Sequence, residues 1–206
     1  LASEWSYDAN DPHTLYGWGR DSQGELGLNY KAPGNGGSKS SPTQIGTSNN
    51  WLAITDGKES NFTIGSKVDG TLWSWGYGTQ GALGQNNTDS RSSPIQIPGT
   101  TWSSNLSTGE NFAMSTKTDG TLWGWGKNPD GSLGLNDNVK YSSPMQVGAD
   151  TTWTSVASQW YSSFGVKTDG TLWSWGSGDN GMLGHNSRTD YSSPIQIPGT
   201  FPTGGT

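Results

Sequence analysis

The residue types that most often carry chemistry in proteins are few in this chain of 206 residues, and they are scattered. There is no cysteine, which excludes disulfides, thiolate metal sites and thiol catalysis. The two histidines, His13 and His185, lie in non-equivalent places outside any triad or zinc-ligand spacing, so we expect solvent-exposed turn residues. No two carboxylates recur at a spacing that would pair them for acid–base catalysis. We therefore expect no catalytic residues, no enzymatic activity and no cofactor.

Ligand spacing, charge and hydropathy argue against metal binding, nucleic-acid binding and membrane insertion, in that order. Residues 128–131 (NPDG) lack the alternating ligands and the distal Glu of a calcium loop, so we expect no metal site. The formal net charge is −6 and there is no basic run, which argues against nucleic-acid binding. No apolar run approaches the roughly 18 residues needed to span a membrane, so we expect no membrane insertion.

Aromatic residues, in contrast, follow a fixed period. The motif DGTLWxWG occurs at 69–76, 119–126 and 169–176, and a degraded copy, DPHTLYGWG, occurs at 11–19. The second tryptophan of each copy gives spacings of 57, 50 and 50 residues, for Trp18, Trp75, Trp125 and Trp175. A period of this length is typical of repeat architectures.

Each repeat contains four short segments with the character of strands. In the third complete copy they are 142–147 (SSPMQV), 153–157 (WTSVA), 163–167 (SFGVK) and 171–175 (TLWSW). Asp169-Gly170 joins the last two and favours a two-residue type I′ hairpin turn. Four short strands per repeat, without helical periodicity, predict an all-β fold: a β-propeller built from four four-stranded repeats.

The repeat frame also predicts how the chain is divided. We expect a single domain, 1–206, with units at roughly 194–206 plus 1–41, 42–93, 94–143 and 144–193. Phe201 takes the place of the second-strand tryptophan, so the N- and C-terminal pieces are in phase and would share one blade, closing the ring. The alternatives are part of a longer propeller and two chains that complete one ring. The first residue, Leu1, leaves open whether a leader was removed.

Three segments, 106–113 (LSTGENFA), 117–126 (KTDGTLWGWG) and 131–134 (GSLG), together resemble a repeat of the regulator of chromosome condensation family. The near-identity of the units resembles bacterial and phage-borne members. This resemblance implies a β-propeller, usually of seven blades, and its best-known activity is nucleotide exchange on a small GTPase tied to chromatin. The acidity of the chain argues against the chromatin part. No segment matches a GTPase-engaging wedge, so we do not carry that activity over.

The paired tryptophans have two interpretations. The rings of a pair are two residues apart on a strand and face one side, where they could pack against the next blade or form a sugar-stacking platform. Because all units keep the pair in one register, we favour packing between blades. Trp5 and Trp160 lie outside this register and are better candidates for exposed contacts.

The positions that differ between copies lie in the loops that follow each Trp-Gly and in those that precede each Ser-Ser-Pro. Loops on a rigid scaffold commonly carry recognition. We therefore predict a partner-binding surface that includes these five residues: Arg20, Tyr77, Lys127, Trp160 and Asp179.

The sequence thus predicts a non-enzymatic β-propeller that presents variable loops to a protein partner. The expected setting is a structural protein that is secreted or belongs to a cell surface or virion. A lectin-like propeller that binds glycans through Trp5, Trp160 or loop aromatics is the alternative, and a fragment of a larger seven-bladed regulatory propeller is a weaker one. An oligomer is compatible with each of these.

Overall fold

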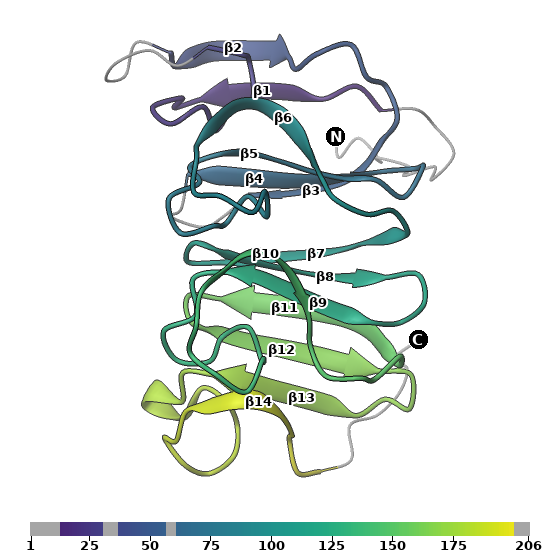
Figure 1. Cartoon of the computed structure of the whole chain (residues 1–206), viewed down its shortest axis with the longest axis vertical. Coiled ribbons are helices and arrows are strands. Elements are labelled where there is room, and N and C mark those ends of the chain that lie inside the picture. The colour runs from purple at the N-terminus through teal and green to yellow at the C-terminus, as the bar shows by residue number, and fades with distance from the viewer. Residues whose placement is uncertain (1–12, 31–36, 57–60, 200–206) are drawn as a thin grey trace, which may run out of the picture.

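A computed structural model describes residues 13–30, 37–56 and 61–199, and these form short antiparallel sheets that follow one another along the chain. Figure 1 shows the sheets stacked along the long axis of the molecule, with the strands running across it. The fold is therefore all-β with repeated antiparallel sheets, as the repeat pattern predicted.

The first sheet contains β1 (Tyr16–Gly19) and β2 (Lys39–Gln44). The second pairs, in order, β3 (Trp51–Asp56), β4 (Phe62–Lys67), β5 (Leu72–Gly76) and β6 (Arg91–Ile97). The third pairs β7 (Trp102–Gly109), β8 (Phe112–Lys117), β9 (Leu122–Gly126) and β10 (Tyr141–Gln146). The fourth pairs β11 (Trp153–Gln159), β12 (Ser162–Lys167), β13 (Leu172–Gly176) and β14 (Tyr191–Gln196), with a short 3-10 helix, η1 (Asp179–Gly181), in its last loop.

The sheets are displaced by one strand from the predicted units. The Ser-Ser-Pro segment was expected to open each unit, but it forms the last strand of the preceding sheet: β6 pairs with β5, with Ile95 opposite Ser74. The same pairing joins β10 to β9 and β14 to β13. The loop after Trp-Gly folds back through the Leu-Gly turn and leads into the Ser-Ser-Pro strand. This strand then forms hydrogen bonds with the backbone groups on the free edge of the Trp-Gly strand.

The Asp-Gly hairpins differ from the predicted type I′ turn. Gly70 has a φ of +76°, whereas Asp69 is not among the residues with positive φ. Lys67 O accepts from Gly70 N at 3.0 Å, which gives a type I turn followed by a left-handed glycine. The Asp69 carboxylate accepts from Thr71 N at 3.0 Å and Thr71 Oγ1 at 2.6 Å. The aspartate therefore acts through its side chain, and the Thr71 hydroxyl holds the Asp69 pKa below its usual value.

The second tryptophan of each complete pair lies buried between two sheets. Each indole Nε1 donates to a carbonyl in the Leu-Gly turn of the preceding sheet, at 2.9 Å in every case: Trp75 to Glu25 O, Trp125 to Ala82 O and Trp175 to Ser132 O. The predicted packing between blades is confirmed for these three residues. A buried indole N–H without a partner would be costly, so the bond also fixes the depth at which each ring inserts.

The first tryptophan of each pair packs within its own sheet instead. Trp51 stands edge-on to Trp73 and Trp75, with ring centres 6.3 and 5.7 Å apart. Lys67 Nζ lies 4.2 Å from the centre of the Trp73 ring, a cation–π contact. The third and fourth sheets repeat this cluster around Lys117 and Lys167.

The two ends of the stack lie far apart. β1 and β2 are at the top of Figure 1, and β13 and β14 are at the bottom. The predicted sharing of one blade by the chain ends depends on residues 1–12 and 200–206, which lie outside the described residues, as does Trp5. In the described part of the chain, no helix is long and apolar enough to cross a membrane.

Candidate functional site

All five residues predicted to bind a partner lie at the same end of the sheets. Four of them follow β1, β5, β9 and β13, and Trp160 lies in the turn between β11 and β12. Backbone bonds join each loop to the neighbouring turn: Tyr77 N donates to Asn61 O at 2.8 Å, and Lys127 N donates to Asn111 O at 2.9 Å. We call this end the loop face, defined by residues 20–22, 77–79, 109–111, 127–130, 159–161 and 177–182.

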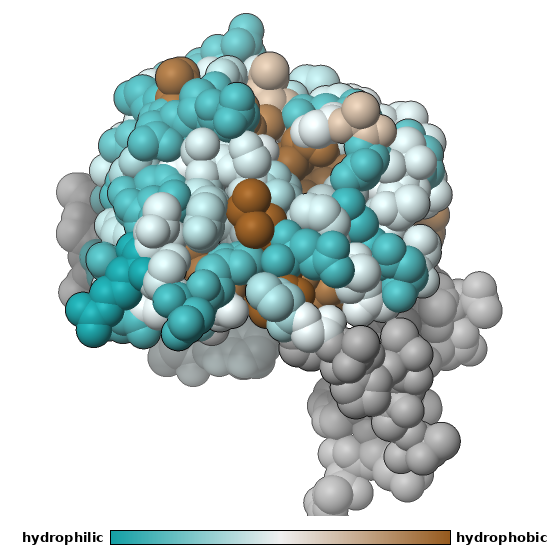
Figure 2. Space-filling model, turned by 90° about the horizontal axis from the view of Figure 1, so that it is seen from below, coloured by the Kyte–Doolittle hydropathy of each residue, from teal (hydrophilic) through white to brown (hydrophobic). Residues whose placement is uncertain are grey.

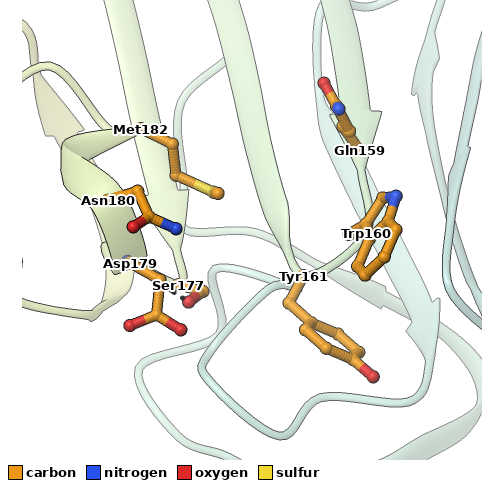
Figure 3. A pocket seen from close by; sticks show the side chains of 7 residues that line it. All are labelled: Gln159, Trp160, Tyr161, Ser177, Asp179, Asn180 and Met182. Atoms are coloured by element: carbon orange, nitrogen blue, oxygen red, sulfur yellow. Dashed lines mark hydrogen bonds between the residues drawn. The ribbon is translucent and has the colours of Figure 1, made fainter.

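An open cavity of about 390 Å³ lies on the loop face at the fourth sheet (Figure 3). It brings together two of the predicted residues, Trp160 and Asp179. In Figure 3 the rings of Trp160 and Tyr161 stand on one side, and Asp179, Asn180 and Met182 stand on the other. The cavity therefore combines aromatic surface with polar groups, the usual composition of a recognition site.

Trp160 has an unusual backbone as well as an exposed side chain. Its side chain is 56% exposed and its φ is +48°. The corresponding turn of the third sheet has its left-handed residue one position later, at Asn111 with a φ of +61°, a residue type that tolerates this region well. A bulky residue in the left-handed region costs stability, and such strain tends to occur at functional sites.

Lys127 is held in a small network that joins the third and fourth sheets. Its Nζ lies 3.2 Å from Glu110 Oε1 and 3.2 Å from Tyr161 Oη, and 4.6 Å from the centre of the Tyr161 ring. The backbone N–H of Glu110 also donates to Trp160 O at 2.9 Å. Lys127 thereby holds the ring of Tyr161, one of the two aromatic residues that line the cavity.

Three acidic residues gather near the cavity: Asp179 lines it, and Asp130 and Asp190 lie close enough for their charges to interact. Burial raises the pKa of Asp130, and the nearby negative charges of Asp190 and Asp179 raise it further, against the opposing effect of Lys127. Asp190 Oδ1 accepts from Gly178 N at 2.8 Å, which anchors it beside η1. Such a group of acidic residues favours a ligand with cationic groups.

Arg20 and Tyr77 lie on the loop face but outside this cavity. Arg20 lines a second cavity, of about 330 Å³, together with Trp18 and residues of the second sheet such as Asp56 and Asn61. Its Nε donates to Ser22 Oγ at 2.9 Å. Tyr77 belongs to the second sheet and is half-buried. The structure thus brings Trp160, Asp179 and Lys127 together and leaves the other two as separate parts of the same face.

Several residues of the site did not stand out in the sequence. Tyr161 belongs to it through the turn between β11 and β12, and Glu110 through the turn between β7 and β8; Asn180 lies in η1, and Met182 follows it. One signal was available: where the third repeat has Glu110-Asn111, the fourth has two aromatic residues. Conversely, Asn128 lies in a variable loop but is buried, because its Oδ1 accepts from Leu133 N at 2.9 Å.

Neither histidine has the environment expected of a solvent-exposed turn residue. His185 is half-buried: its Nε2 lies 2.9 Å from Ser174 Oγ, and its ring stands edge-on to Tyr191 at 5.2 Å. His13 forms a β-bridge with Trp51. Among the residues that the structure describes, no three His, Asp or Glu side chains are grouped so that they could hold a metal ion.

The repeated sheets, with a tryptophan bonded into each preceding turn, define a β-propeller of one particular repeat type. The family model of the regulator of chromosome condensation (RCC1) repeat matches residues 69–115, 119–166 and 169–202, and the chain belongs to this family. Among curated proteins, the E3 ubiquitin-protein ligase HERC2 of human and of mouse is 29% identical over 98 residues. That match covers 46% of this chain and 2% of HERC2.

Solved structures show the same fold. Prp20p of Saccharomyces cerevisiae, described with its binding properties to Gsp1p and histones, superposes with a TM-score of 0.76 at 20% identity, over 91% of this chain and 47% of Prp20p. The same yeast protein bound to Kap60 gives 0.76 at 21% identity, over 91% and 45%. Human WBSCR16 gives 0.74 at 20% identity, over 93% and 50%. The chain thus spans about half the length of these structures. These relatives are yeast and mammalian, and they give no support to the expected bacterial or phage affinity.

Proposed function

We propose that this RCC1-repeat β-propeller domain is a non-enzymatic interaction module whose loop face binds a protein partner. The observation that carries the proposal is Trp160, which is 56% exposed at a φ of +48° beside the cavity of the fourth sheet. Tryptophan, tyrosine and arginine are enriched among residues that dominate binding energy, and the loop face presents all three.

The charge near the cavity indicates the chemistry of the partner. Burial raises the pKa of Asp130, and the negative charges of Asp190 and Asp179 raise it further. A lysine or arginine of the partner placed among them would relieve their mutual repulsion, so we propose a partner with a basic segment. The yeast RCC1 protein bound to Kap60 supports the idea that propellers of this type bind proteins. We further propose a surface, secreted or virion-associated setting, on the basis of the acidity and the polar loops.

A capture experiment tests the proposal. The immobilised chain is exposed to a lysate, and the Trp160→Ala, Lys127→Ala and Tyr77→Ala variants are compared with it by quantitative mass spectrometry. We expect Trp160→Ala to reduce capture of a specific protein at least about tenfold, as for a central aromatic anchor. The matched control is Val68→Ala, because Val68 is 53% exposed in the hairpin at the opposite end of the second sheet. Equal capture by the wild type and all three loop-face variants would overturn the proposal.

A lectin-like function is the second candidate. The Trp160 and Tyr161 rings stand opposite Asp179 and Asn180 across the cavity, which is an arrangement able to stack a sugar ring and bond its hydroxyls (Figure 3). A glycan array followed by tryptophan-fluorescence titration separates the two candidates. Saturable binding of a glycan that is lost in Trp160→Ala would favour the lectin, and no binding across the array would favour the protein partner.

A further inference from the structure

The three interfaces between neighbouring sheets are built in the same way. A tryptophan of the later sheet enters beside the glycine of the Leu-Gly turn of the earlier sheet and bonds to the carbonyl two residues before that glycine. The missing side chain of the glycine is essential, because a Cβ would lie 2.9 Å from Trp75 Nε1 at Gly27, 3.1 Å from Trp125 Nε1 at Gly84 and 2.9 Å from Trp175 Nε1 at Gly134. Each sheet therefore has a donor face, which presents the tryptophan, and an acceptor face, which presents the turn.

The acceptor face of the fourth sheet is open. Gly184 corresponds to Gly84 and Gly134, but among the described residues only Ile197 lies within 4 Å of its Cβ position. Met182, which supplies the carbonyl two residues earlier, is 45% exposed, whereas its counterparts Ala82 and Ser132 are buried.

The apolar residues of that face are also less buried than their counterparts in the second sheet. Ile64, Leu72 and Ile97 of the second sheet are 0% exposed. Their counterparts in the fourth sheet, Phe164, Leu172 and Ile197, are only half-buried. Figure 2, which looks onto this end of the molecule, shows hydrophobic patches open among the hydrophilic residues. The fourth sheet thus carries an acceptor face without its tryptophan.

The donor face of the first sheet is open as well. Tyr16 and Trp18 correspond to Trp73 and Trp75. Trp75 is 1% exposed, whereas Trp18 is 62% and Tyr16 is 47% exposed. A large aromatic side chain removes roughly 150–250 Å² from water when it is buried, so two such rings on one edge are a strong drive for association.

We infer that this chain associates head to tail with a second copy of itself: Trp18 of one copy enters beside Gly184 of the other, and its Nε1 donates to the Met182 carbonyl. The geometry of the three internal interfaces is the template for this contact. A head-to-tail interface forms a closed ring when its rotation closes. The chain covers 45% to 50% of the propeller chains on which it superposes well, so two copies would supply about one ring and use both pairs of open faces.

The mass of the chain in solution tests the inference. Light scattering of the 206-residue chain is expected to give twice the 21.9 kDa of one copy at micromolar concentration. Trp18→Ala removes the ring, and Gly184→Asn places a Cβ where the ring must lie, in a residue type that tolerates the φ of +77°. We expect each variant to weaken association at least about 30-fold, the effect of removing an aromatic anchor, and to be a monomer.

Mixing the two variants gives a sharper result. A Trp18→Ala copy retains its acceptor face and a Gly184→Asn copy retains its donor face, so an equimolar mixture restores one interface. We expect the mixture to form a heterodimer although neither variant self-associates. Trp160→Ala, on the loop face, is the matched control and should keep the wild-type mass. Met182 belongs both to the acceptor turn and to the lining of the Trp160 cavity, whereas Gly184 does not line that cavity, so Gly184→Asn tests association without changing a cavity residue.

Three outcomes would overturn the inference. They are a wild-type chain that is a monomer at concentrations of tens of micromolar, single variants that keep the wild-type mass, and a mixture that stays monomeric. Circular dichroism of each variant confirms that a loss of mass reflects association and not unfolding. Capture of the partner by the monomeric Gly184→Asn variant would show that the loop face works without the second copy.

Discussion

At the scale of single residues, a missing Cβ decides whether two sheets can pack. Gly134 has a φ of +73°, and a Cβ there would lie 2.9 Å from Trp175 Nε1 and 3.1 Å from Val147 Cγ1. The Leu-Gly pairs were visible in the sequence as a recurrent mark. Their role was not, because it depends on a ring supplied by the next repeat, some 40 residues later.

Replacing Gly134 therefore has a specific expected cost. Gly134→Ala should lower the free energy of unfolding by about 2–4 kcal/mol, from the left-handed backbone and the overpacked indole together. Gly148→Ala is the matched control: its φ is +62°, but no described residue lies within 4 Å of its Cβ position, so it should lower the free energy of unfolding by only about 1 kcal/mol. Urea unfolding measures both. Equal losses would show that the contact with Trp175 contributes nothing.

The hairpin aspartates give a prediction for pH. The Thr121 hydroxyl and backbone N–H hold the pKa of Asp119 below 3.8. A lowered pKa in the folded state contributes stability above pH 3.8, and this contribution is lost as the pH falls through the folded-state value. Thr121→Val should move the Asp119 pKa back toward 3.8, whereas Thr121→Ser should leave it low. NMR titration of the carboxyl checks both, and an unchanged pKa in Thr121→Val would contradict the assigned cause.

At the scale of elements, the repeat pattern predicted the strands but not their grouping. Periodicity places a strand at each Ser-Ser-Pro, yet a repeat has no natural first residue, so the sequence could not show which neighbour this strand joins. Pairing with the strand before it is a tertiary property, determined by how the loop folds back through the Leu-Gly turn. The predicted type of the Asp-Gly turns was wrong for a different reason. A three-residue turn with a bulge uses the same residue types as a type I′ turn, so the sequence does not distinguish the two.

The interface between sheets yields the element-scale prediction. Trp125 is 0% exposed and bonds to Ala82 O across the second and third sheets. Trp125→Phe removes the hydrogen-bond donor, leaves the Ala82 carbonyl without this partner and creates a cavity. It should therefore lower the free energy of unfolding by about 2–4 kcal/mol. Trp160→Ala should change stability by less than about 1 kcal/mol, because its ring is mostly in water. If Trp125→Phe lowered the free energy of unfolding less than Trp160→Ala in the same assay, the structural role assigned to Trp125 would be contradicted.

At the scale of the whole molecule, scaffold and recognition occupy different parts of each repeat. The positions that repeat build the buried interfaces, and the positions that vary meet on the loop face. The contrast between copies pointed to Lys127 and Asp179, and the position of Trp160 outside the tryptophan-pair register pointed to that residue; the structure places all three near the cavity of the fourth sheet, and their role in binding stays a prediction. The contrast could not show that Tyr161 and η1 complete the cavity, since these come together only when the turn after β11 lies beside the loop after β13. It also included Asn128, whose side chain is buried and structural.

Hydrogen exchange, measured by mass spectrometry on the free chain and on its complex with the captured protein, tests the division between scaffold and loop face most directly. The account predicts new protection at 109–111, 127–130, 159–161 and 177–182. The hairpins at 68–71, 118–121 and 168–171, at the other end of the sheets, should exchange as they do in the free chain. Protection that appears in these hairpins while the loop face exchanges unchanged would contradict the account.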